Sequence, residues 1–127
     1  MNKCMKVFLV FLLMLSVICT SALASGNVIF SFTNTTTDQW GTSDSTTAEG
    51  QKWDVRIDTI SNYGVGRVFE AGTYNWGSGL YTYGPSSYGW RPAKKYDGVS
   101  HGDTIVWRMR QDTDYSSAFS CSGLFRP

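Results

Sequence analysis

Hydrophobic and polar residues alternate with a period of two along several short stretches of the chain. Within residues 52–60, Trp53, Val55 and Ile57 alternate with charged residues, which is typical of a strand in a sheet with one solvent-facing side. Three further stretches alternate in the same way, namely residues 28–33, 104–111 and 115–124. The pattern therefore predicts a set of short strands, each with one apolar face.

The segments between these strands are rich in turn-forming residues. The sequence Ser-Asn-Tyr-Gly at residues 61–64 predicts a turn, because Asn and Gly tolerate positive φ. We expect residues 65–71 to return after it as the hairpin partner of the strand over residues 52–60. Residues 34–50 contain many Ser and Thr and one large apolar side chain, Trp40. They predict a long polar loop that could carry a short strand or a mobile flap.

The same pattern decides the fold class. After the N-terminal segment, no long stretch shows an apolar period of 3.6 residues, so we expect almost no helix there. Several short strands separated by turns need two layers to bury their apolar faces. The sequence therefore predicts an all-β protein with a small antiparallel β-sandwich, and a small β-barrel is the alternative.

The N-terminal segment has the composition of an export signal. Two lysines precede an uninterrupted apolar run over residues 7–15, and the segment closes on Ala-Leu-Ala at residues 22–24. We predict a signal helix over residues 1–24 that is cleaved after Ala24, which leaves a single β domain over residues 25–127. The apolar run is shorter than the roughly 20 residues that span a bilayer. We therefore expect a secreted, extracellular protein with no membrane span in its mature form.

Charge and cysteine content limit the expected partners and the expected source of stability. Without residues 1–24 the chain carries 9 basic and 10 acidic residues, and this balance argues against nucleic acid as a partner. Two of the three cysteines leave with the signal, so Cys121 has no partner for an internal disulfide. We expect its sulfur to lie on the apolar face of a strand as a small hydrophobic group, and packed aromatic rings to supply the stability.

Residues 74–90 contain three aromatic-x-aromatic units that start seven residues apart. Residues two apart on a strand share a face, so each unit could present two rings side by side. Flat aromatic rings flanked by hydroxyl and amide groups suit the C–H faces of sugars, which predicts a ligand-binding surface for a cell-wall or extracellular glycan. The alternative is that these rings are core residues together with ordinary surface residues of strands. The six candidate residues are Tyr74, Trp76, Tyr81, Tyr83, Tyr88 and Trp90.

The sequence predicts no catalytic residue, no metal site and no cofactor. His101 is the only histidine, and no Gly-rich phosphate loop lies between a strand and a helix. The acidic residues could in principle supply a glycosidase pair, which needs two carboxyl groups about 5 to 10 Å apart. A small carboxylate-dependent hydrolase therefore stays open as an alternative function.

The chain also resembles a known group of proteins. It combines a cleavable signal, a Ser-, Thr-, Tyr- and Trp-rich mature part of about a hundred residues, an opening strand over residues 28–32 and the closing sequence Ser-Gly-Leu-Phe-Arg-Pro at residues 122–127. These features resemble the small uncharacterised exported proteins of Gram-positive bacteria that are grouped as a domain of unknown function. The resemblance implies secretion and a β-rich fold, and it carries no catalytic residues.

These observations lead to one main functional hypothesis and two alternatives. The main hypothesis is a secreted non-enzymatic protein that works by surface contact, with cell-envelope glycans as the expected partner of the clustered rings. The first alternative is a bacteriocin-like antagonistic protein, and the second is the small hydrolase. The strand over residues 28–32 is apolar, uncharged and near the terminus of the mature chain, so it could also pair with a neighbouring chain, and the sequence leaves the oligomeric state open.

Overall fold

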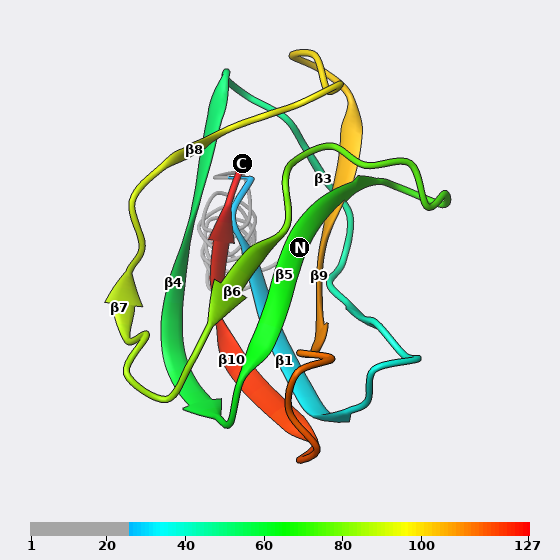
Figure 1. Ribbon diagram of the computed structural model, residues 1–127. Coiled ribbons are helices and arrows are strands. Elements are labelled where there is room, and N and C mark those ends of the chain that lie inside the picture. Colours follow the sequence, from blue (N-terminus) through cyan, green and yellow to red (C-terminus); the bar gives the residue numbers. More distant parts are fainter. Residues whose placement is uncertain (1–25) are drawn as a thin grey trace, which may run out of the picture.

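The computed structural model describes residues 26–127, which form two antiparallel β-sheets packed face to face (Figure 1). We call the first of them sheet A. Its strands lie in the order β1 (Val28–Thr35), β10 (Phe119–Arg126), β4 (Lys52–Ser61) and β7 (Gly89–Trp90), and β8 (Lys94–Lys95) pairs with the start of β4. Sheet B has the order β2 (Gly41–Thr42), β9 (Thr104–Gln111), β5 (Gly64–Glu70) and β6 (Tyr81–Tyr83), and β3 (Thr46–Thr47) pairs with the start of β9.

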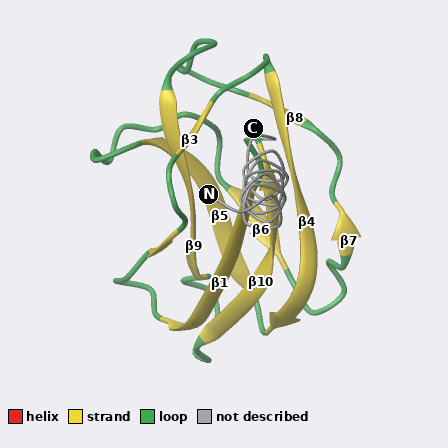
Figure 2. Ribbon diagram, turned by 180° about the vertical axis from the view of Figure 1, so that it is seen from behind, coloured by secondary structure: helices red, strands yellow, loops and turns green. Residues whose placement is uncertain are grey.

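The predicted fold class is confirmed. No helix occurs within residues 26–127, and the strands form the two layers of an antiparallel sandwich (Figure 2). The two sheets stay separate, so the barrel alternative is wrong. The signal helix expected over residues 1–24 lies outside the described residues.

Aromatic side chains fill the space between the sheets. Trp107 of β9 lies at the centre, where its ring stacks on that of Phe125 with centroids 5.6 Å apart and an interplanar angle of 8°. The ring centroid of Trp53 lies 5.1 Å from that of Trp107. Cys121 is free and belongs to the same buried cluster, which confirms that its sulfur packs as a small hydrophobic group. Stacked rings therefore hold the two layers together where a disulfide could have done so.

The alternation seen in the sequence matches the inner faces of the strands. The predicted inward residues of β4 and β9 are all fully buried, namely Trp53, Val55, Ile57, Ile105, Trp107 and Met109. One irregularity interrupts the alternation in β4. Gly123 of β10 pairs with Ile57 while the next pair involves Thr59, so Asp58 is the extra residue of a β-bulge. A Cβ at Gly123 would lie 1.8 Å from a backbone oxygen of β4, so only glycine fits there.

The predicted hairpin between residues 52–60 and 65–71 is wrong. β4 pairs with β10 in sheet A and β5 pairs with β9 in sheet B, so the turn at residues 61–64 carries the chain from one sheet to the other. Asn62 has the positive φ of 63° that the turn chemistry predicted. Turn residues determine that the chain reverses direction. Whether the two flanking strands pair by hydrogen bonds in one sheet or lie in opposite sheets depends on where their apolar faces are buried.

Two other segments differ in detail from the pattern. The polar loop over residues 34–50 contains β2 and β3, which both pair with β9, so its short-strand version is confirmed. The last strand begins at Phe119 and not at Tyr115, because the chain turns at Asp112, whose carbonyl accepts a hydrogen bond from the Tyr115 N–H over 3.1 Å. Within residues 26–127 there is no helix of the length and apolarity that a bilayer crossing requires.

Candidate functional site

The six candidate rings do not form one surface. Tyr83 of β6 is 4% exposed and packs edge-on against Trp107 with centroids 6.1 Å apart. Tyr81 is half-buried, and its ring lies 5.6 Å from that of Trp53. Because both tyrosines point inward from β6, they belong to the core, as the alternative interpretation of the aromatic run expected for some of the rings.

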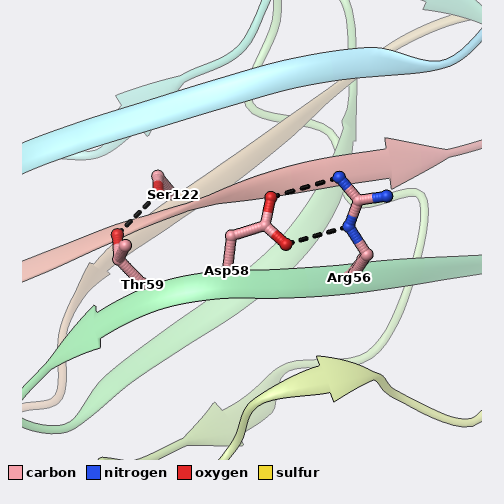
Figure 3. A network of polar contacts seen from close by, with 4 residues as sticks. All are labelled: Arg56, Asp58, Thr59 and Ser122. Carbon is pink, nitrogen blue, oxygen red and sulfur yellow. Dashed lines mark hydrogen bonds and ion pairs between the residues drawn. The ribbon is translucent and has the colours of Figure 1, made fainter.

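Two further rings lie on the side of sheet A. Trp90 pairs with Arg56 of β4, and its ring lies 4.1 Å from the guanidinium carbon of Arg126 and 5.7 Å from that of Arg56. Tyr88 is exposed and directly precedes β7, which is the edge strand of the sheet (Figure 1). Figure 3 shows the polar groups of the same outer face, where Arg56 pairs with Asp58.

The remaining two rings, Tyr74 and Trp76, lie on the outer face of sheet B. After β5 the chain turns back along the strand: the N–H of Gly77 donates to the carbonyl of Val68 over 2.8 Å, and Trp76 bridges to Phe69. Directly paired residues share a face of a sheet, so Trp76 lies on the same side as Phe69. Tyr74 and Trp76 are 74% and 66% exposed.

These two rings belong to a larger surface, which we call the aromatic–arginine face. Arg67 lies over Trp76, with its guanidinium carbon 3.9 Å from the ring centroid. Such stacking of a cation on a ring is favourable, most of all where water is partly excluded. The face consists of Arg67 and Phe69 from β5, Arg108 and Arg110 from β9, and Trp40, Tyr74 and Trp76 from the flanking loops.

Phe69 is the centre of this face. It is 2% exposed although it points away from the core, because the rings of Trp40 and Tyr74 pack edge-on against it at 5.2 and 6.2 Å. Arg108 covers it from a third side, with its guanidinium carbon 4.7 Å from the ring centroids of both Phe69 and Tyr74. The loops around sheet B thus build a second, smaller apolar layer on its outer side.

An open groove of about 610 Å³ borders the aromatic–arginine face. It lies between β1, at one edge of sheet A, and the loop that leads into β2, at one edge of sheet B. Trp40 and Tyr74 belong to both the groove and the face. The other residues that line the groove are mostly polar, namely Ser31, Phe32, Thr33, Asn34, Thr35, Asp38, Gln39 and Gly41.

Backbone geometry places the polar residues of this groove. Asn34 has a positive φ of 52°, and its N–H donates to the hydroxyl of Ser120 over 3.0 Å. The register of β1 and β10 shifts between Phe32 and Thr35 at the same point. This irregularity ends the regular pairing of β1 and leads the chain into the polar segment that carries Asp38 and Gln39.

Sequence reasoning missed Trp40 and the three arginines of the face. Trp40 stands alone as a large ring in a polar loop, and this was the available signal that it is not a regular core residue. Nothing local indicated that it would meet Tyr74 beside one groove. The arginines of β9 fitted the polar positions of a strand, so their stacking on rings from distant loops could not be read from the alternation.

A smaller groove of about 400 Å³ lies at residues 50–51, 95–96 and 99–101. His101 donates one hydrogen bond there, from its Nδ1 to the carbonyl of Glu49 over 2.8 Å. Burial raises the pKa of Tyr96, whose hydroxyl has no hydrogen-bond partner among the described residues. Neither groove is lined by a pair of carboxylates from residues 26–127, so the hydrolase alternative stays a prediction.

The described part of the chain contains no group of three or more His, Cys, Asp or Glu side chains placed to hold a metal ion. Cys121 lies between the sheets while His101 lies on an exposed loop, so the two do not form a nucleophilic pair. Comparison with known proteins identifies no matching family model, no matching curated protein and no matching solved structure. The resemblance to exported Gram-positive proteins and the bacteriocin-like alternative both stay predictions.

Proposed function

We propose that this protein is exported and works as a non-enzymatic binding protein for cell-envelope glycans, which it holds in the groove between β1 and β2. The observation that carries the proposal is the pair of rings, Trp40 and Tyr74, beside a groove whose other lining residues are mostly polar. Aromatic rings provide flat apolar surface at low entropy cost, and the amide, carboxylate and hydroxyl groups of the lining can hydrogen-bond to sugar hydroxyls.

The groove suits a chain-like ligand better than a small enclosed one. It is open and runs along the edges of the two sheets, so a polymer could pass through it without a free end. Ligands that bind along such open surfaces depend on a few aromatic anchors and on a rim of hydrogen-bonding groups. The Asn34 and Gln39 side chains of the lining offer both donors and acceptors, and the Asp38 carboxylate offers acceptors.

Retention on insoluble cell-wall polysaccharides tests this proposal. We expect the Trp40→Ala, Tyr74→Ala double variant to lose retention about tenfold, which corresponds to about 1.4 kcal/mol of binding free energy. The matched control is Tyr88→Ala, Trp90→Ala, which removes two exposed rings on the side of sheet A. Equal retention of wild type and the Trp40/Tyr74 variant would contradict the proposal, and a loss confined to the control would move the site to sheet A.

Trp40 also packs on Phe69, so its removal could weaken the fold as well as the groove. The single variant Tyr74→Ala disturbs the fold less, because Tyr74 is 74% exposed and contacts Phe69 only edge-on with centroids 6.2 Å apart. A melting curve for each variant shows whether it is folded at the temperature of the binding assay. Reduced retention by folded Tyr74→Ala protein is the decisive result for the groove.

A further inference from the structure

Three arginines meet on the aromatic–arginine face. Arg67 of β5 and Arg108 of β9 are direct cross-strand partners, and Arg110 lies two residues further along β9 on the same side. Like charges placed directly opposite each other destabilise a sheet. The arrangement therefore needs a compensating interaction, which the rings beneath the guanidinium groups supply only in part.

No carboxylate of the described residues forms an ion pair with any of these arginines. Arg108 is held within the protein, because its Nε donates to the Thr42 hydroxyl over 3.0 Å and one terminal nitrogen donates to the Thr73 carbonyl over 2.8 Å. Within residues 26–127 the Arg110 side chain donates only to the carbonyl of its neighbour Gln111. Two guanidinium groups of the face, those of Arg67 and Arg110, thus keep donors for a ligand.

Arg67 is the least satisfied of the three. Its Nε is buried and has no acceptor among residues 26–127. Burial lowers the pKa of Arg67, the charge of Arg110 lowers it further, and Asp97 offsets this in part. An anion placed between Arg67 and Arg110 would relieve both the desolvation and the repulsion.

The positive charge is local to this face. Residues 26–127 carry nine Lys and Arg side chains against ten Asp and Glu, so the domain as a whole has no positive field. Binding to nucleic acid or to an anionic lipid surface relies on such a field over a wide area. A local cluster of arginines beside stacked rings and a polar groove suits instead a polymer that carries both sugar rings and spaced negative charges.

We propose that the glycan held in the groove is anionic, and that Arg67 and Arg110 bind its carboxylate or phosphate groups where it leaves the groove across sheet B. The inference rests on the proposed function, since it assigns the charge of the same ligand. Trp40 connects the two parts, because it lines the groove and its ring lies 4.8 Å from the guanidinium carbon of Arg110.

Purified Gram-positive cell walls in three forms test this inference: untreated walls, walls stripped of phosphodiester-linked polymers with hydrofluoric acid, and walls with amidated carboxylates. Wild-type retention falls about tenfold on one of the treated forms, and the form identifies phosphate or carboxylate as the bound group. Raising NaCl from about 0.05 M to about 0.5 M weakens retention on untreated walls, because salt screens exposed charges.

Two matched variants remove the same charge from opposite sides of the protein. We expect Arg67→Gln, Arg110→Gln to bind untreated walls no better than wild type binds the treated form. The control Arg56→Gln, Arg126→Gln removes two arginines that are paired with aspartates on sheet A, and it keeps wild-type retention. Arg108 stays in place because it supports the fold, and single Arg67→Gln replaces the double variant if the latter melts below the assay temperature.

The possible results distinguish failure of this inference from failure of the proposed function. Equal wild-type retention on all three wall forms, or equal losses in the two double variants, overturns the inference. If retention still depends on Trp40 and Tyr74 in that case, the proposed function stands without it. Absence of retention on untreated walls overturns both, and tighter retention on DNA-cellulose than on walls replaces the glycan by nucleic acid.

Discussion

Arginines on the outer faces of both sheets lie over aromatic rings, but within residues 26–127 only those on sheet A also pair with carboxylates. On sheet A, Arg56 pairs with Asp58 over 2.9 Å, and Arg126 pairs with Asp54. These hydrogen bonds raise the pKa of both arginines. Figure 3 shows how close the Arg56 pair lies to a second polar contact across β4 and β10. On sheet B, the arginines lie over aromatic rings and have no carboxylate partner among the described residues.

The difference follows from what covers each face. The outer side of sheet A is open, and Ile29 is 81% exposed there. The outer side of sheet B is covered by Trp40 and by the turn that carries Tyr74 and Trp76. This cover buries Phe69. Charges that are neutralised within the protein leave a face inert, whereas stacked arginines without partners leave a face that attracts anions.

The largest expected difference between the two faces is in the stability lost when one side chain on each face is truncated. We expect Phe69→Ala to lower the free energy of unfolding by about 3 kcal/mol, because it empties the centre of the second apolar layer. Ile29→Ala on sheet A should change it by less than about 0.5 kcal/mol, since Ile29 is exposed. Urea unfolding of both variants measures the difference. Similar small losses of unfolding free energy in both variants would show that the residues covering sheet B contribute no packing.

A smaller effect separates the two kinds of arginine. Arg108 is 7% exposed, and its replacement by Gln removes hydrogen bonds to Thr42 and Thr73. We expect Arg108→Gln to cost about 2 kcal/mol in urea unfolding, because two part-buried hydrogen bonds from a charged donor are lost. Arg126→Gln breaks an exposed ion pair and should leave the unfolding midpoint almost unchanged. A larger loss of stability in Arg126→Gln than in Arg108→Gln would contradict this prediction.

Alkaline pH has the smallest expected effect on the free energy of unfolding. This effect arises between the sheets and not on either outer face. Burial, with a smaller contribution from Asp58, raises the pKa of the Cys121 thiol from 9.0 to about 12. Above pH 9 the unfolded chain loses this proton while the folded chain keeps it, so stability falls as pH rises. We expect a loss of about 1 kcal/mol between pH 8 and pH 10.

The matched variant for this measurement is Cys121→Ala. It is less stable at neutral pH because it leaves a cavity, but its stability declines less steeply with pH. A weaker decline remains, since burial also raises the pKa of Tyr83. A slope that is unchanged in Cys121→Ala but altered in Arg67→Gln would assign the effect to sheet B.

Part of the candidate site followed from the sequence. Clustered rings beside polar residues predicted an aromatic surface, and the structure places Tyr74 and Trp76 on such a surface. It separates Tyr88 and Trp90 from them and buries Tyr83. Spacing could not tell these cases apart, because two residues that share a face of a strand share it equally well inward or outward.

The sequence by itself determined the strands and the composition of the core. Period-two alternation is a local property of each strand, so Trp53 and Trp107 could be assigned to the buried side before any partner was known. Tertiary structure alone decided that the turn at residues 61–64 joins two sheets, and that Trp40 and Tyr74 both pack on Phe69 and line one groove. These are contacts between segments distant in the chain. They depend on how whole faces are buried against each other, which no local pattern records.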